Sequence, residues 1–168
     1  LKDLSVAFGA TVDEDDLKFR KANGYISTHY VCCTDGFPNV FTFSPPAEGV
    51  FIGWYSIAAD FDGFLRWAYN SWVEKPLQDS RFRTWPAGDT YIVYPDNRSS
   101  IRFETLREGI QDAEKIRILR EDFIKRNMKE ELNLLNETVA KFNITKKPDN
   151  LEALIDEGKA VLTALSRK

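Results

Sequence analysis

Short strand-like segments alternate with helical segments through the first part of the chain. Alternating, β-branched or aromatic residues predict strands at residues 1–8, 25–33 and 62–67, with glycine or acidic turns beside them. Helical spacing of apolar residues predicts helices between them, at residues 13–24 and 44–61. Strands that alternate with helices favour a parallel sheet with right-handed crossovers. The predicted fold class is therefore α/β.

The ends of the first two helices carry recognisable signals. Residues 13–16 are all acidic, and acids at a helix start are favoured by the helix dipole. Ser44 is expected to cap the second helix, with Pro45 at its first position, where a missing N–H costs nothing.

The rest of the chain is predicted to be mainly helical. An irregular stretch at residues 73–89 leads into a brief extended segment at 90–95. Amphipathic patterns then predict helices at 99–123, 129–142 and 149–165. Three strands are too few for a closed eight-stranded (β/α)8 barrel, which needs about 250 residues. The sequence can therefore supply only the last part of such a barrel, followed by a helical extension.

Composition argues against several classes of function. The net charge is −3, and basic residues are interleaved with acids, so no basic face for nucleic acid is expected. No apolar run approaches the roughly 20 residues that span a bilayer. Cys32 and Cys33 are adjacent and His29 is the sole histidine, which gives poor support for a disulfide or a zinc site. The chain opens at Leu1 with its one methionine at Met128, so we expect a processed chain or a piece of a longer one.

The stretch GFLRWAYNSW, residues 63–72, is the strongest candidate for a binding surface. Trp67, Tyr69, Asn70 and Trp72 follow a predicted strand, and parallel α/β folds bind ligands at the carboxyl ends of their strands. Sugar rings present C–H faces that suit aromatic rings, and their hydroxyls need amide or carboxylate partners. The same tryptophans could instead be core residues or plugs at a barrel end, and composition alone leaves both interpretations open.

Several ionisable residues have a simple structural explanation beside a functional one. Asp13 and Glu14 form a tempting carboxylate pair, although a helix start explains them more simply. Glu48 lies in a first helical turn and could also bond to substrate. Asp89 is expected to be a turn residue. His29 at the end of the second strand could contact a ligand, but a core position is more common for a lone histidine.

Several motifs in order resemble the C-terminal catalytic region of bacterial glycoside hydrolase family 123. They are SPPAE, GFLRWAYNSW, GDT, YP and SSIRFETLREG, and the resemblance covers Leu4 to Leu119. It implies residues 1–124 as the C-terminal part of a TIM-barrel catalytic domain and residues 125–168 as a helical C-terminal extension. It also implies release of N-acetylgalactosamine from β-linked glycans by a retaining mechanism in which the substrate's 2-acetamido oxygen attacks the anomeric carbon. No metal or organic cofactor is implied.

The resemblance also implies how the site is divided along the protein. In the family, an aspartate orients the acetamido group and an adjacent glutamate is the general acid, and this pair lies upstream of the region matched here. The catalytic roles are therefore not assigned to Asp13 and Glu14. The chain is expected to supply the substrate-binding pocket wall, from the five residues Tyr30, Glu48, Trp67, Asn70 and Trp72.

The expected partners are a glycan substrate and the missing N-terminal part of the barrel, without which this chain is expected to be inactive. A periplasmic or secreted bacterial location follows from the resemblance. Two alternatives stay open: a non-catalytic carbohydrate-binding protein, and a structural or interaction module whose aromatic residues seal a core.

Overall fold

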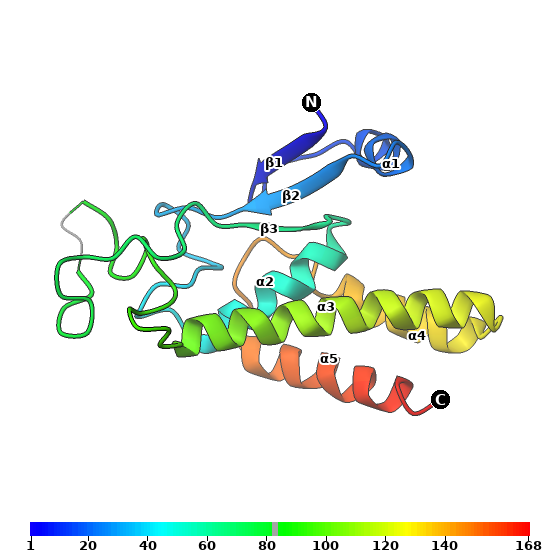
Figure 1. Cartoon of the computed structure of the whole chain (residues 1–168). Helices are drawn as coiled ribbons and strands as arrows, with labels where there is room; N and C mark the ends of the chain where they lie inside the picture. Colours follow the sequence, from blue (N-terminus) through cyan, green and yellow to red (C-terminus); the bar gives the residue numbers. More distant parts are fainter. Residues whose placement is uncertain (82–83) are drawn as a thin grey trace.

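The computed structural model describes residues 1–81 and 84–168, which form a small parallel sheet and five helices (Figure 1). The elements follow one another as β1 (Asp3–Ala7), α1 (Glu14–Ala22), β2 (Ile26–Tyr30), α2 (Pro46–Ala58), β3 (Gly63–Leu65), α3 (Ile101–Lys125), α4 (Lys129–Ala140) and α5 (Leu151–Leu165). The predicted α/β class and the order of these elements are confirmed.

The sheet has the order β1-β2-β3, and both pairs of strands are parallel. Ala7, Tyr30 and Leu65 are neighbours in register, so the three strands end at one edge of the sheet. The connection from β3 to α3 lies beyond the end to which the strands point (Figure 1). The described strands form an open sheet, and its place in a (β/α)8 barrel stays a prediction.

Helix α2 begins one residue later than the sequence predicted, and Ser44 does not cap it. Pro45 occupies the N-cap position with an extended backbone (φ −54°, ψ 136°), and Pro46 is the first helical residue. A residue that precedes proline is driven away from the helical conformation, so the helix can begin only at the second proline. The Ser44 hydroxyl instead accepts a hydrogen bond from the Phe41 N–H at 3.1 Å.

The predicted extended segment at residues 90–95 is not a strand of the sheet. It pairs back on the loop after β3 through an isolated antiparallel bridge between Asn70 and Tyr91. Left-handed residues bound it on both sides, with φ of +79° at Gly88, +61° at Asp96 and +58° at Asn97. These turns redirect the chain on both sides of the segment, and alternation along the sequence could not reveal them.

Helix α2 is the centre of the molecule, between the sheet and the layer of α3 and α5 (Figure 1). Most of its residues are buried, and Trp54 stacks on Phe142 with ring centroids 4.3 Å apart. Residues of α4 and α5 belong to the same hydrophobic cluster as those of α2. The C-terminal helices therefore share one core with the α/β part, and the domain boundary after residue 124 stays a prediction.

Helices α2 and α3 approach closely because two glycines face each other at their crossing. A Cβ atom built on Gly53 would overlap the backbone of Gly109, and one on Gly109 would overlap the carbonyl of Val50.

Among the described residues, no helix is long and apolar enough to cross a membrane.

Candidate functional site

The carboxyl edge of the sheet collects polar and aromatic side chains from two strands. Tyr30 is the last residue of β2, and Arg66 and Trp67 directly follow β3. Because the strands are parallel and end in register, these side chains lie at the edge where parallel α/β folds bind ligands.

Asp89 joins this edge from the loop that follows β3. Its Oδ1 accepts from Arg66 Nη2 at 3.0 Å, and its Oδ2 accepts from the indole Nε1 of Trp67 at 3.0 Å. Asp89 and Arg66 are buried, whereas Trp67 is 44% exposed. The carboxylate therefore fixes the edge of the indole while the rest of the ring stays accessible.

Charges at this edge act on one another. Burial lowers the pKa of Arg66, and the nearby Asp89 carboxylate opposes that shift. Burial also raises the pKa of Tyr30, helped by Cys32 and Asp89 and opposed by Arg66. Tyr30 is thus a neutral hydroxyl at ordinary pH, able to donate or accept a hydrogen bond.

Glu48 lies inside the protein, and its carboxylate is not free to bind a ligand at the carboxyl edge of the sheet. It is 1% exposed, its Oε2 accepts from the Asn39 N–H at 2.9 Å, and its Oε1 pairs with Lys147 Nζ at 2.8 Å. Its contact with substrate stays a prediction, and it would require the carboxylate to exchange these partners.

Asn70 and Trp72 lie together at a separate cavity of about 350 Å³. The indole Nε1 of Trp72 donates to the Val93 carbonyl at 2.8 Å, and the side chain is 43% exposed. The cavity also has aromatic walls, from Tyr69, Tyr94 and Phe103. The half-exposed state of Trp67 and Trp72 favours a binding wall over a sealed aromatic core, and their roles stay predictions.

His29 is a core residue. It is fully buried, its Nε2 lies 3.0 Å from the Ser56 hydroxyl, and its ring packs against Tyr55 and Phe64. Burial lowers its pKa to about 4, against the weaker opposing effect of the Ile52 carbonyl, which accepts from the ring. The imidazole is therefore neutral at pH 7 and has no open face for a ligand.

Comparison with known proteins identifies the family of this chain. The family model for the glycoside hydrolase 123 catalytic domain matches residues 1–119. The chain belongs to glycoside hydrolase family 123. A search of curated proteins finds no match.

A solved family 123 glycoside hydrolase from Clostridium perfringens, studied for glycolipid glycan hydrolysis, has a similar structure, with a TM-score of 0.79 and 25% identity. The match covers 99% of this chain and 32% of the clostridial enzyme, so the chain spans about a third of that protein. It extends beyond residue 119, where the family model ends, and so includes α4 and α5.

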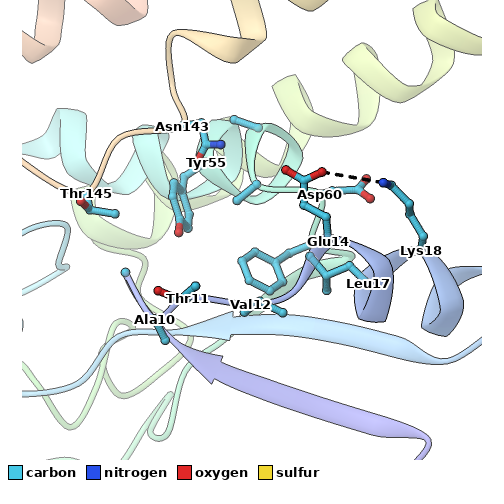
Figure 2. A pocket seen from close by; sticks show the side chains of 14 residues that line it. Ala10, Thr11, Val12, Glu14, Leu17, Lys18, Tyr55, Asp60, Asn143 and Thr145 are labelled. Atoms are coloured by element: carbon cyan, nitrogen blue, oxygen red, sulfur yellow. Dashed lines mark ion pairs between the residues drawn. The ribbon is translucent and has the colours of Figure 1, made fainter.

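The Asp13–Glu14 pair of this family 123 chain lies elsewhere. Asp13 caps α1, and its Oδ1 accepts from the Asp15 N–H at 2.8 Å. Glu14 lines a pocket of about 360 Å³ and pairs with Lys18 at 3.7 Å (Figure 2). The pocket lies between the β1–α1 connection, the end of α2 and the loop after α4. None of the residues predicted to bind substrate lines it.

Sequence reasoning missed the contacts of three residues that organise the edge, Asn39, Arg66 and Asp89, although Asp89 lies in a turn as predicted. Each is buried, and Asn39 Oδ1 accepts from Arg66 Nη1 at 3.0 Å. For Arg66 the available signal was a charged residue within the apolar run FLRWAY, because a buried charge almost always has a charged partner. Pairing across a loop cannot be seen in sequence.

The described residues hold no group of three or more His, Cys, Asp or Glu side chains that could bind a metal ion.

Proposed function

We propose that this chain is part of a glycoside hydrolase that releases N-acetylgalactosamine from β-linked glycans. The observation that carries the proposal is the open indole of Trp67, fixed by Asp89 at the ligand-binding edge of a family 123 chain. An indole face suits the C–H face of a pyranose, and nearby hydroxyl and amide groups suit its hydroxyls. Tyr30 ends the neighbouring strand β2, and Asn70 lies three residues after Trp67 in the chain.

The proposed mechanism is substrate-assisted and retaining, with the 2-acetamido oxygen as nucleophile. It needs a general acid and a carboxylate that holds the acetamido group. Asp13 is a helix cap, while Glu48 and Asp89 are buried and bonded to protein donors. As the resemblance to the family implies, we assign the catalytic pair to a segment that precedes this chain, and we expect the 168 residues alone to be inactive.

In this proposal, the missing part of a (β/α)8 barrel covers the free side of strand β3 and the apolar surface beside it. Strand β3 pairs with β2 and has no second partner among the described strands. A cavity of about 500 Å³ lies beside it, lined by apolar side chains of three elements that include Ile57, Phe64 and Ile110. A strand with an unpaired side next to an apolar surface is prone to aggregation, and natural proteins usually cover it. A bacterial periplasmic or secreted location belongs to the proposal as well.

The test uses the natural gene product that contains this chain. We expect it to hydrolyse an aryl 2-acetamido-2-deoxy-β-galactoside and to form the β-anomer first, as followed by NMR. The matching aryl β-galactoside without the acetamido group should react at least about 100-fold more slowly, because it lacks the nucleophile. Equal rates on the two substrates, or an α-anomer as first product, would overturn the mechanism.

A non-catalytic carbohydrate-binding protein is the second candidate. The observation in its favour is that each carboxylate discussed above has a structural partner in this chain. Calorimetric binding of N-acetylgalactosamine by the gene product, with no turnover of the aryl glycoside, would establish this alternative.

A further inference from the structure

A continuous line of polar contacts joins the C-terminal helices to Trp67. It begins at Lys147, in the loop between α4 and α5, which pairs with Glu48 at 2.8 Å. The other oxygen of Glu48 accepts from the main-chain N–H of Asn39 at 2.9 Å. The first of these contacts connects residues that are 99 positions apart in the sequence.

The line continues from Asn39 to the candidate site. Its side-chain Oδ1 accepts from Arg66 Nη1 at 3.0 Å, and Arg66 Nη2 pairs with Asp89 Oδ1 at 3.0 Å. The remaining oxygen of Asp89 accepts the indole N–H of Trp67 at 3.0 Å. In each intermediate residue, one atom contacts the neighbour on the Lys147 side and another contacts the neighbour on the Trp67 side.

We infer that Lys147 and Glu48 are positioning residues, which hold the Trp67 indole in its orientation through Asn39, Arg66 and Asp89. The inference deepens the proposed function, since it assigns to the C-terminal helices the geometry of the sugar-binding wall. It also gives Glu48 a role that requires no contact with substrate.

Because the line is buried, its geometry should depend on the Lys147–Glu48 pair at its exposed end. Glu48 and the groups between it and Trp67 are nearly or fully shielded from water, whereas the Lys147 side chain is 45% exposed. A buried carboxylate that loses its cation must find other donors or admit water. The donor that remains is the Asn39 N–H, and any shift of Asn39 moves the acceptor of Arg66.

The test reads the indole directly and needs no sugar. In the ¹⁵N-labelled natural gene product, the Trp67 indole signal is assigned with Trp67→Phe. Lys147→Met should shift this signal and speed its hydrogen exchange at least about tenfold, because the hydrogen bond to Asp89 opens more often. Lys147→Arg should restore the native signal. Lys146→Met is the matched control, an exposed neighbour that should change nothing.

A second set of variants tests the path. Glu48→Gln should shift the same signal, and in that background Lys147→Met should add little, because the charge pair is already gone. Full additivity of the two substitutions would overturn the path. An unchanged Trp67 signal in folded Lys147→Met would overturn the inference. If Lys147→Met fails to fold, an unchanged signal in Glu48→Gln overturns it instead.

Kinetics then separate this inference from the proposed function. On the aryl N-acetylgalactosaminide, Lys147→Met should raise KM at least about threefold and change kcat less, as expected for weakened uniform binding. A parent protein that neither binds nor hydrolyses the glycoside defeats the proposed function alone, because the indole signal still decides the positioning role.

Discussion

Arg66 Nη2 lies 3.0 Å from Asp89 Oδ1, and the two side chains form a buried ion pair between the end of β3 and the loop that follows it. The pair closes this loop against the sheet and leaves the second Asp89 oxygen for Trp67. A buried pair of this kind is costly to break, because the surviving charge has no water to replace its partner.

We predict that Asp89→Asn lowers the free energy of unfolding by about 3–5 kcal/mol, since it leaves the Arg66 charge buried without a counter-ion. Urea unfolding followed by circular dichroism measures the change. The control is Glu157→Gln, which breaks the exposed pair with Lys141 and should cost less than about 1 kcal/mol. Equal losses in the two variants would show that the Arg66–Asp89 pair is not effectively buried.

The stability of the protein should fall in mild acid because of His29. Its folded-state pKa of about 4 is below the ordinary value of 6.5, so the unfolded chain binds its proton first as the pH falls. The neutral imidazole therefore favours the folded state fully above pH 6.5, and this contribution is lost as the pH falls toward 4. Between pH 6.5 and 5 the loss should be roughly 2 kcal/mol.

Urea unfolding at several pH values measures this slope. In His29→Gln the slope between pH 6.5 and 5 should be much flatter, because no other histidine is present. An equal slope in parent and variant would assign the effect to carboxylates.

The crossing of α2 and α3 gives a packing prediction. Gly53→Ala should cost about 3 kcal/mol of unfolding free energy, because the new methyl group meets the Gly109 backbone and the helices must separate. Gly63→Ala is the control, since a Cβ there meets nothing within 4 Å. Thermal unfolding compares the two, and a Gly53→Ala variant as stable as the control would contradict the close approach.

The fold was largely predictable because its signals are local. Apolar spacing and the acids at the start of α1 act within a few residues. The start of α2 was misplaced because two adjacent prolines compete for the first helical position. That error is also local, and the rule for residues before proline could have corrected it.

The site was less predictable because its organising contacts are distant in sequence. Trp67 could be proposed from its position after a strand, but the partner of its indole is 22 residues away. Asp89 lies in a turn and Glu48 in the first turn of α2, as predicted, but neither position indicates the partner of its carboxylate. The partners that define both carboxylates become visible only once the chain is folded.

Glu14 offers a test of where the catalytic acid lies. Its side chain is exposed and lines the pocket of Figure 2, apart from Trp67 and Tyr30. We predict that Glu14→Gln in the natural gene product leaves kcat within a few-fold of the parent. Loss of a general acid typically lowers the rate by about 10²–10⁴. A fall of that size, with the circular dichroism spectrum unchanged, would make Asp13 and Glu14 the catalytic pair.

The most direct measurement is kcat/KM of Trp67→Ala on an aryl 2-acetamido-2-deoxy-β-galactoside, in the natural gene product. Removal of the indole deletes the surface on which the sugar is proposed to stack, so kcat/KM should fall at least about tenfold. Phe19→Ala, which removes an exposed aromatic ring on α1, should leave it unchanged. If Trp67→Ala folds normally and keeps the parent's kcat/KM, Trp67 does not bind the sugar and this edge of the sheet is not the pocket wall.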